Sequence, residues 1–217
     1  LTKGIGHTEF KNSELGRIPK SWEVINLGSI SQVVDSMHQT PTFSDHGKAM
    51  VRVTEIRNGE FIDISSAVNV NEETYKAFTK NYKSRFGDIL IARVGAYFGA
   101  TTYVDKEVTF CLGQNTAAIR PKDIESDFLF FFINSECVSN QMNDVVSVGA
   151  QPSLSLEVIK KIKIMCPPDS EQKLIAKSIF SITSKITNTN LKLHQTQSFK
   201  KSLMQDLLTG KVRVTVN

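Results

Sequence analysis

The stretch between Pro168 and Gly210 constrains this chain most strongly, because no proline or glycine lies between those two residues. Ser170 is a good N-cap, and Glu171 places a carboxylate near the positive end of a helix dipole. Gly210 is a typical residue for ending a helix. The pattern predicts one helix over residues 171–208, about 57 Å long at about 1.5 Å per residue. A small domain does not need that length for its own core, so we expect a partner helix.

Apolar residues in this stretch recur at alternating spacings of four and three, which is typical of a coiled-coil seam. Polar residues weaken the middle of the seam at Thr189, Thr196 and Lys200. A helix lying across its own domain also carries an apolar face, so the pattern leaves that alternative open. The residues predicted to form the seam are Ile175, Ile179, Ile182, Ile186, Leu193, Leu203 and Leu207.

The composition is that of an ordinary globular protein, since 40% of the 217 residues are hydrophobic and 22% are charged. The longest apolar run, Phe128 to Ile133, is too short to cross a bilayer, and the chain shows no basic-then-apolar leader. We therefore expect a soluble, cytoplasmic protein without a membrane partner. Leu1 stands where Met would begin a complete chain, which indicates a processed chain or a fragment.

The residues that usually carry catalysis or bind metals form no recognisable motif. Cys111, Cys137 and Cys166 are widely spaced and make no CxxC pair, so we expect buried free thiols rather than metal ligands. The four histidines also lack ligand spacing. There is no GxSxG elbow, no phosphate-binding P-loop and no Asp/Asn-Pro-Pro-Tyr methyltransferase motif. These absences favour a binding protein without cofactor, metal site or catalytic residue.

Charge is distributed unevenly along the chain. The residues from Glu171 onward carry a net charge of +6. Because the whole chain carries a net charge of +4, the first 170 residues carry a net charge of −2. Any surface for nucleic acid on the first part must therefore be local. One such concentration lies between Lys76 and Arg93, where five basic residues accompany a single acid, Asp88.

Several short apolar segments before the long helix have the alternation of strands. Residues 50–57 read as a strand that presents Arg52 and Thr54 on one face, followed by an Asn58-Gly59 hairpin turn and a returning strand over residues 61–64. Trp22 is expected to anchor the interior. Further strands are predicted at 22–27, 86–95, 100–104, 108–112, 116–120 and 161–165, a helix at 126–142 and a loop at 148–152. Many short strands, few helices and one terminal long helix predict an α+β fold with a helical appendage.

Seven segments in order resemble one family, the DNA-specificity (S) subunits of type I restriction-modification systems. Each segment is weak alone, but together they are highly specific. They are Leu15–Val24, Val51–Ile56, Gly87–Arg93, Gln114–Pro121, Gly149–Ser155, Pro167-Pro168 with Glu171-Gln172, and Leu203–Lys211.

The resemblance implies a non-catalytic subunit that reads one half of a split DNA target. It also implies partners: double-stranded DNA, methyltransferase (M) subunits that carry adenine methylation, restriction (R) subunits in the full complex, and an antiparallel coiled coil with the other half-subunit or a second copy. The implied domains are a lead-in at 1–15 that ends a preceding spacer helix, a target-recognition domain at 16–168, the spacer helix at 169–210 and a tail at 211–217.

Base edges are read by Arg, Gln, Asn and Thr side chains on a rigid face, and phosphates by Lys and Arg. Arg93 and Gln114 lie in family motifs although specificity varies between members, so a structural role for them stays open. Segments 37–48 and 71–85 depart from the pattern shared by the family, and we expect them to determine which DNA sequence is recognised. A coiled-coil interaction protein without DNA readout is the alternative function. The predicted DNA-contacting residues are Arg52, Thr54, Arg57, Lys83, Arg93, Gln114, Asn115 and Gln151.

Overall fold

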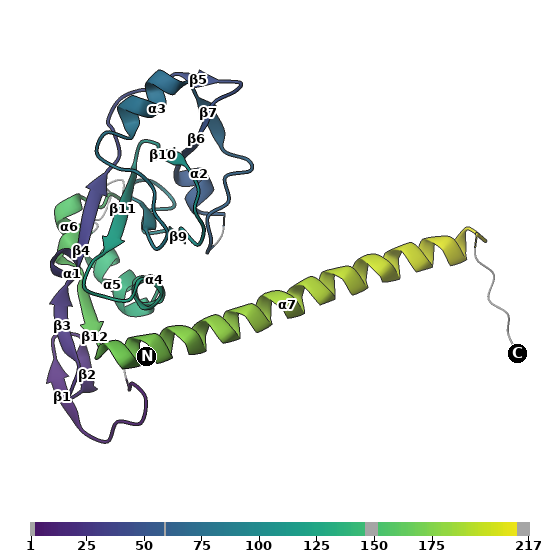
Figure 1. The fold of residues 1–217 in the computed structure, drawn as a ribbon. Helices are drawn as coiled ribbons and strands as arrows, with labels where there is room; N and C mark the ends of the chain where they lie inside the picture. Colours follow the sequence, from purple (N-terminus) through teal and green to yellow (C-terminus); the bar gives the residue numbers. More distant parts are fainter. Residues whose placement is uncertain (1–2, 59, 146–151, 212–217) are drawn as a thin grey trace, which may run out of the picture. The chain divides into compact units, whose positions relative to one another are not determined.

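The structure is a computed structural model that describes residues 3–58, 60–145 and 152–211. The chain divides into two compact units, Leu1–Ile175 and Ala176–Asn217. The first contains all the strands and short helices that the structure describes, and the second contains most of the long helix (Figure 1). This confirms the predicted α+β fold with a long C-terminal helix.

Two four-stranded sheets form the centre of the first unit. One is antiparallel with strand order β4-β11-β8-β9, and the other has the order β10-β6-β7-β5 with β10 and β6 parallel. Two ribbons, β1-β2 and β12-β3, complete the described strands. The strands are β1 (Phe10–Ser13), β2 (Gly16–Pro19), β3 (Glu23–Asn26), β4 (Ser31–Asp35), β5 (Phe43–Ser44), β6 (Lys48–Val51), β7 (Val68–Val70), β8 (Ile89–Ala92), β9 (Thr101–Tyr103), β10 (Phe110–Leu112), β11 (Thr116–Pro121) and β12 (Lys163–Cys166).

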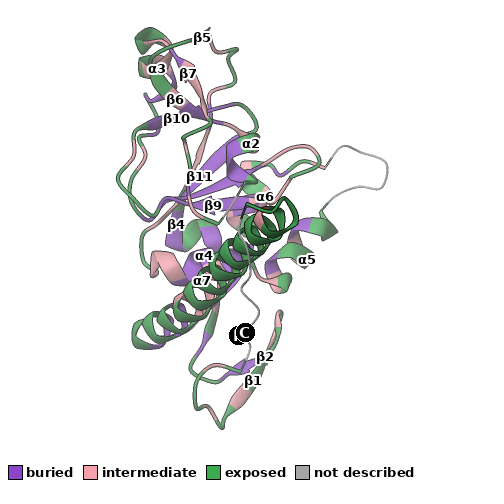
Figure 2. Cartoon of the chain, turned by 90° about the vertical axis from the view of Figure 1, so that its right-hand side faces the viewer, coloured by how far each residue is buried: buried purple, intermediate pink, exposed green. Residues whose placement is uncertain are grey.

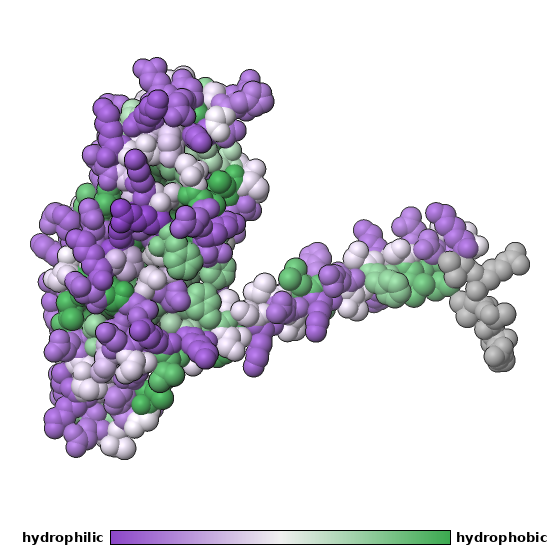
Figure 3. All heavy atoms as spheres, in the orientation of Figure 1, coloured by the Kyte–Doolittle hydropathy of each residue, from purple (hydrophilic) through white to green (hydrophobic). Residues whose placement is uncertain are grey.

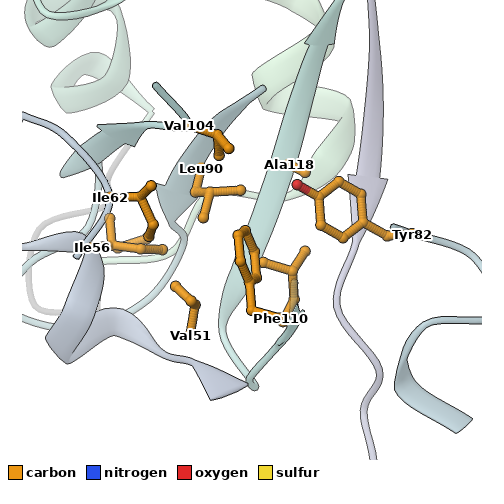
Figure 4. Packing of buried hydrophobic residues seen from close by; sticks show 10 residues of the cluster. Val51, Ile56, Ile62, Tyr82, Leu90, Val104, Phe110 and Ala118 are labelled. Atoms are coloured by element: carbon orange, nitrogen blue, oxygen red, sulfur yellow. The ribbon is translucent and has the colours of Figure 1, made fainter. Parts of the chain in front are cut away.

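The main core fills the space where β6, β10 and α2 face β8 and β11 (Figure 4). Val51 and Phe110 from one sheet pack in the same cluster as Leu90 and Ala118 from the other. All these side chains are fully buried, and burial of each large apolar side chain is worth about 1.5–3 kcal/mol. The core therefore fixes the ends of β6, β8, β10 and β11 relative to one another.

Short helices lie between the strands and on the sheets. The segment expected as one helix over residues 126–142 is two helices, because the chain breaks at Asn134 and Ser135, where the Asn134 amide caps the carbonyl of Phe130 at 2.9 Å. The helices α1, α3 and α6 were not predicted. The helices are α1 (Leu27–Ile30), α2 (Val53–Ile56), α3 (Glu72–Phe78), α4 (Ser126–Ile133), α5 (Glu136–Asp144), α6 (Leu156–Lys161) and α7 (Asp169–Leu208).

The predicted strand at 50–57 with its hairpin is wrong after Val51. Arg52 is the N-cap of α2, and the Glu55 carboxylate accepts a hydrogen bond from the Arg52 backbone N–H at 2.8 Å, which is the half of a capping box that a glutamate at the third helical position supplies. The expected returning strand is reduced to one isolated bridge between Phe61 and Tyr103, and Gly59 lies outside the described residues. A local capping interaction has replaced the strand that the alternation suggested.

The first turn of α7 belongs to the globular unit. Trp22 is fully buried, as predicted, and its indole N–H donates to Glu171 at 3.0 Å. The Glu171 carboxylate also accepts the backbone N–H of Ile5 and contacts His7 Nε2, both at 2.9 Å. This carboxylate thus ties the lead-in segment, the Trp22 turn and the start of the long helix together.

The far end of α7 closes as the sequence predicts. Gly210 has a positive φ of 71°, and the backbone N–H groups of Gly210 and Lys211 donate to the carbonyls of Leu207 and Asp206. That pair of hydrogen bonds is a Schellman motif. The helix contains 40 residues, which corresponds to about 60 Å.

Most of α7 beyond Ile175 is exposed (Figure 2). Apolar side chains gather along its last turns (Figure 3). The polar seam residues Thr189 and Thr196 each donate their hydroxyl to the carbonyl four residues earlier, at 2.8 Å. Because these hydroxyls are already bonded, burying the two threonines against a partner leaves no donor unsatisfied.

Candidate nucleic-acid interface

The loops at one end of the two sheets form a surface that we call the sheet rim: the residues after β4, β6 and β8 and between β10 and β11. Three backbone or side-chain contacts hold these loops together. Arg93 N–H donates to Asn115 O at 2.8 Å, Gly113 N–H donates to Val51 O at 2.7 Å, and the Gln114 amide donates to Gln39 O at 2.9 Å. The rim brings together six of the eight predicted DNA-contacting residues: Arg52, Thr54, Arg57, Arg93, Gln114 and Asn115.

Arg52 and Thr54 both bind the same buried carboxylate. Arg52 Nη2 lies 3.0 Å from Glu55 Oε1, and the Thr54 hydroxyl donates to Glu55 at 2.9 Å. Burial raises the pKa of Glu55, but the hydrogen bonds from Arg52 and Thr54 outweigh it and hold that pKa below its ordinary value. The positive charge of the Arg52 guanidinium at the rim is therefore partly neutralised by Glu55.

Arg57 differs because it has no carboxylate partner among the described residues. Its guanidinium carbon lies 4.4 Å from the centroid of the Tyr97 ring, in a cation–π arrangement. Both side chains are exposed. The ring fixes the direction of the guanidinium and leaves its donors free for an anionic or base-edge acceptor.

Arg93 holds the fold together. Its guanidinium pairs with Asp35 at the end of β4 and donates to the Leu154 carbonyl at 2.9 Å, and its side chain is only 13% exposed. Asp35 also lies 2.9 Å from His38 Nε2. The alternative that Arg93 is structural is therefore the one that these contacts favour.

Gln114 and Asn115 occupy the turn between β10 and β11. Gln114 donates its side-chain amide N–H to the Gln39 backbone carbonyl, and the residue as a whole is exposed. Asn115 has a positive φ of 63°, which asparagine tolerates better than most residues. Its exposed side chain stands at the start of β11.

Lys83 lies away from the rim. Its carbonyl accepts a hydrogen bond from Arg120 Nη2 at 2.7 Å, and Arg120 pairs with Asp88 at the opposite end of the β8–β11 pair. Gln151, also predicted as a contact, lies outside the described residues.

The predicted seam residues fall into two groups. Ile175 is 5% exposed and packs within the first unit, whereas Ile179 is half-buried. The remaining five are exposed by 38% to 58% of their surface: Ile182, Ile186, Leu193, Leu203 and Leu207.

Tyr97 is the rim residue that the sequence reasoning missed. Tyr97 lies between Gly95 and Gly99, both of which have a positive φ. An exposed aromatic side chain held in a turn between two such glycines is a signal for a contact surface.

The prediction of buried cysteines is confirmed for Cys111, whose burial raises its pKa to about 11. Cys137 and Cys166 are only half-buried.

Two further features of the described residues bear on the site. No group of three or more His, Cys, Asp or Glu side chains among them could hold a metal ion. Among the same residues, no helix combines the length and apolar character needed to cross a membrane.

The family model described as the type I restriction modification DNA specificity domain matches residues 19–196. The chain belongs to this family. Among curated relatives, this specificity-domain chain is 30% identical over 217 residues to the putative type I restriction enzyme MjaX specificity subunit of Methanocaldococcus jannaschii, and 27% identical over 222 residues to the MjaVIII specificity subunit of the same organism. The matches cover 99% of this chain but 49% and 52% of those relatives, so the chain spans about half their length.

Solved structures share the fold of this specificity domain. A chain from a study of complex assembly and conformational transition in the type I R-M system matches with a TM-score of 0.68 at 19% identity, over 92% of this chain and 47% of that one. The HsdS subunit from Thermoanaerobacter tengcongensis matches with a TM-score of 0.59 at 18% identity, over 82% of this chain and 41% of that one.

Proposed function

We propose that this specificity-domain chain reads one half of a bipartite DNA target for a type I restriction-modification enzyme. The observation that carries the proposal is the family match over residues 19–196 in a chain that spans about half of its curated relatives. One strand-rich unit and one long helix make a single reading unit with a single spacer. The second reading unit is then the other half of a specificity subunit or a second copy of this chain.

Base readout is assigned to the exposed donors and acceptors of the sheet rim. Arg57 leads this assignment because its guanidinium is oriented by Tyr97 and has no carboxylate partner in the described chain. Gln114 and Asn115 present amides that can both donate and accept, as adenine recognition requires. Arg52 and Thr54 are the next candidates, since contact with DNA competes with their bonds to Glu55.

The long helix is assigned as spacer and dock. Its exposed seam pairs antiparallel with the equivalent helix of the other half, and its excess of basic residues meets acidic surfaces of the methyltransferase subunits. Methylation and cleavage belong to those M subunits and to the restriction subunits. Incubation of the chain alone with DNA and labelled S-adenosylmethionine should transfer no methyl group; transfer would contradict a non-catalytic role.

Selection from a randomised duplex pool tests the reading role. The full chain is incubated with the pool at low salt, and bound duplexes are recovered and sequenced. Enrichment of one short common sequence, with affinity that falls steeply with salt, is expected. Absence of enrichment together with a flat salt response would leave a coiled-coil interaction protein without DNA readout. In cells that carry the complete system, methylome sequencing should report the same short sequence as one half-site.

A further inference from the structure

A groove lies at the opposite end of the sheets from the rim, beside α3. It has a volume of about 540 Å³ and is lined by residues that include Tyr75, Lys83, Arg85, Phe86 and Glu107. We call it the α3 groove. We propose that the α3 groove binds the sugar-phosphate backbone of the duplex that the rim reads, an inference that rests on the proposed function.

The charges around the groove favour a polyanion. Neither the Lys83 ammonium nor the Arg85 guanidinium has a carboxylate partner within the described residues. The Lys48 ammonium lies 6.0 Å from the centroid of the Tyr75 ring, which brings a third cation close to the groove. Glu107 is the acid that lines the groove. The described arginines that hold the fold, Arg93 and Arg120, are bound to Asp35 and Asp88 instead.

The neutral lining also suits a nucleic-acid backbone. Phe86 is 59% exposed and packs edge-on to Tyr103, so its free face offers an apolar surface for a deoxyribose. Lys, Arg, Thr and Tyr are the side chains that commonly contact phosphate and sugar, and the groove contains all four types, including Thr109. Backbone contacts of this kind position a duplex without reading its sequence.

The spacing between the groove and the rim matches a duplex. The parallel strands β6 and β10 both begin beside the groove, at Lys48 and after Thr109, and both end at the rim, before Arg52 and Gly113. At about 3.3 Å per residue, three to four residue steps separate the two surfaces by roughly 10–13 Å. The major groove of B-DNA is about 12 Å wide. The two surfaces therefore lie within about one groove width of each other, so a duplex whose bases are read at the rim can bring a flanking backbone to the α3 groove.

Salt titrations of single-charge variants test whether the α3 groove binds the DNA backbone while the rim reads the base sequence. The full chain, Lys83→Gln, Arg85→Gln and Glu107→Gln are titrated with a selected duplex and with a scrambled duplex across a range of salt concentrations. Lys83→Gln and Arg85→Gln should weaken binding to both duplexes by the same factor and lower the salt slope by about 1 each. Glu107→Gln should strengthen binding to both, because it removes an opposing charge.

The matched control is Lys20→Gln, which removes a cation from an exposed pair with Glu9 outside the groove and should leave affinity and slope unchanged. If the unaltered chain binds the selected duplex but Lys83→Gln and Arg85→Gln keep its full salt slope, the groove proposal is wrong and the reading role stands. If Lys83→Gln or Arg85→Gln changes the preference between the selected and the scrambled duplex, the α3 groove contributes to sequence recognition, and the proposal that it binds only the backbone is wrong. If the unaltered chain binds no duplex, the proposed function itself fails.

Discussion

The indole N–H of Trp22 donates to the carboxylate of Glu171 at 3.0 Å, across 149 residues of sequence. This bond attaches the first turn of the long helix to the globular unit. It is reinforced by Ile5 and His7, which bind the same carboxylate. The first turn of α7 is thus held within the globular unit by one buried acid and three partners that are distant from it in sequence.

Stability should depend on pH through Glu171. Burial raises the pKa of this carboxyl, but the hydrogen bonds from Ile5, His7 and Trp22 outweigh burial and lower it below its ordinary value of 4.5. A depressed pKa in the folded state contributes stability that is present above pH 4.5 and lost as the pH falls through the folded value. Urea unfolding from pH 7 to pH 3 should show this loss, and Glu171→Gln should flatten it.

Glu9→Gln is the matched control, because Glu9 makes only an exposed ion pair with Lys20. It should reproduce the pH profile of the unaltered chain. An equally steep acid loss in Glu171→Gln would show that other carboxylates cause it.

The carboxylate of Asp88 should be among the most sensitive positions in the globular unit. It is 1% exposed and accepts hydrogen bonds from the Tyr82 hydroxyl at 2.9 Å, the Arg85 backbone and two nitrogens of Arg120. Asp88→Asn should lower the free energy of unfolding by about 3–5 kcal/mol, because Arg120 loses its buried partner. Tyr82→Phe should cost only about 1 kcal/mol. Denaturant titration checks both, with exposed Asp123→Asn as the control.

Self-association should run through the seam of α7. We expect the chain to dimerise at concentrations on the order of tens of micromolar. Replacing Ile182 and Ile186 by Asp should give monomers in sedimentation velocity, because each charge would be buried in the pairing interface. Leu191→Asp is the matched control, since Leu191 is equally exposed but lies off the seam. A strictly monomeric unaltered chain, or equal disruption by all three substitutions, would contradict the seam.

Arg57 and Arg93 should separate recognition from folding. Arg57→Ala should reduce the preference for the selected duplex by about 1–3 kcal/mol, with no loss of stability beyond its contact with Tyr97. Arg93→Ala should instead lower the free energy of unfolding by about 3 kcal/mol, because Asp35 loses its arginine and the Leu154 carbonyl loses its donor. Competition binding and thermal unfolding measure the two effects. Equal loss of preference in Arg93→Ala without destabilisation would reverse the assignment.

The local pattern of the sequence was enough to predict the long helix and about half of the described strands, but not β1, β2, β4, β5 or β7. The helix 169–208 and the strands at 89–92, 110–112 and 116–121 follow from runs that glycine and proline delimit. The pattern failed at Arg52. Alternation of apolar and polar residues suggested a strand there, but the chain forms the short helix α2, whose Glu55 carboxylate binds the Arg52 backbone N–H. It also failed at Asn134, where a capped carbonyl divides one expected helix into two.

The sequence by itself determined the fold class, the long helix with its apolar seam, and the polar residue types that a DNA-reading face needs. The tertiary structure decided which of those residues are available. Arg93 is engaged by Asp35, 58 residues away, whereas Arg57 lies on Tyr97 without a carboxylate partner in the described chain, and Lys83 stands at the other end of the sheets. The reason is physical: periodicity reports only neighbours along the chain, while the charge state and freedom of an arginine depend on partners that folding brings from far away.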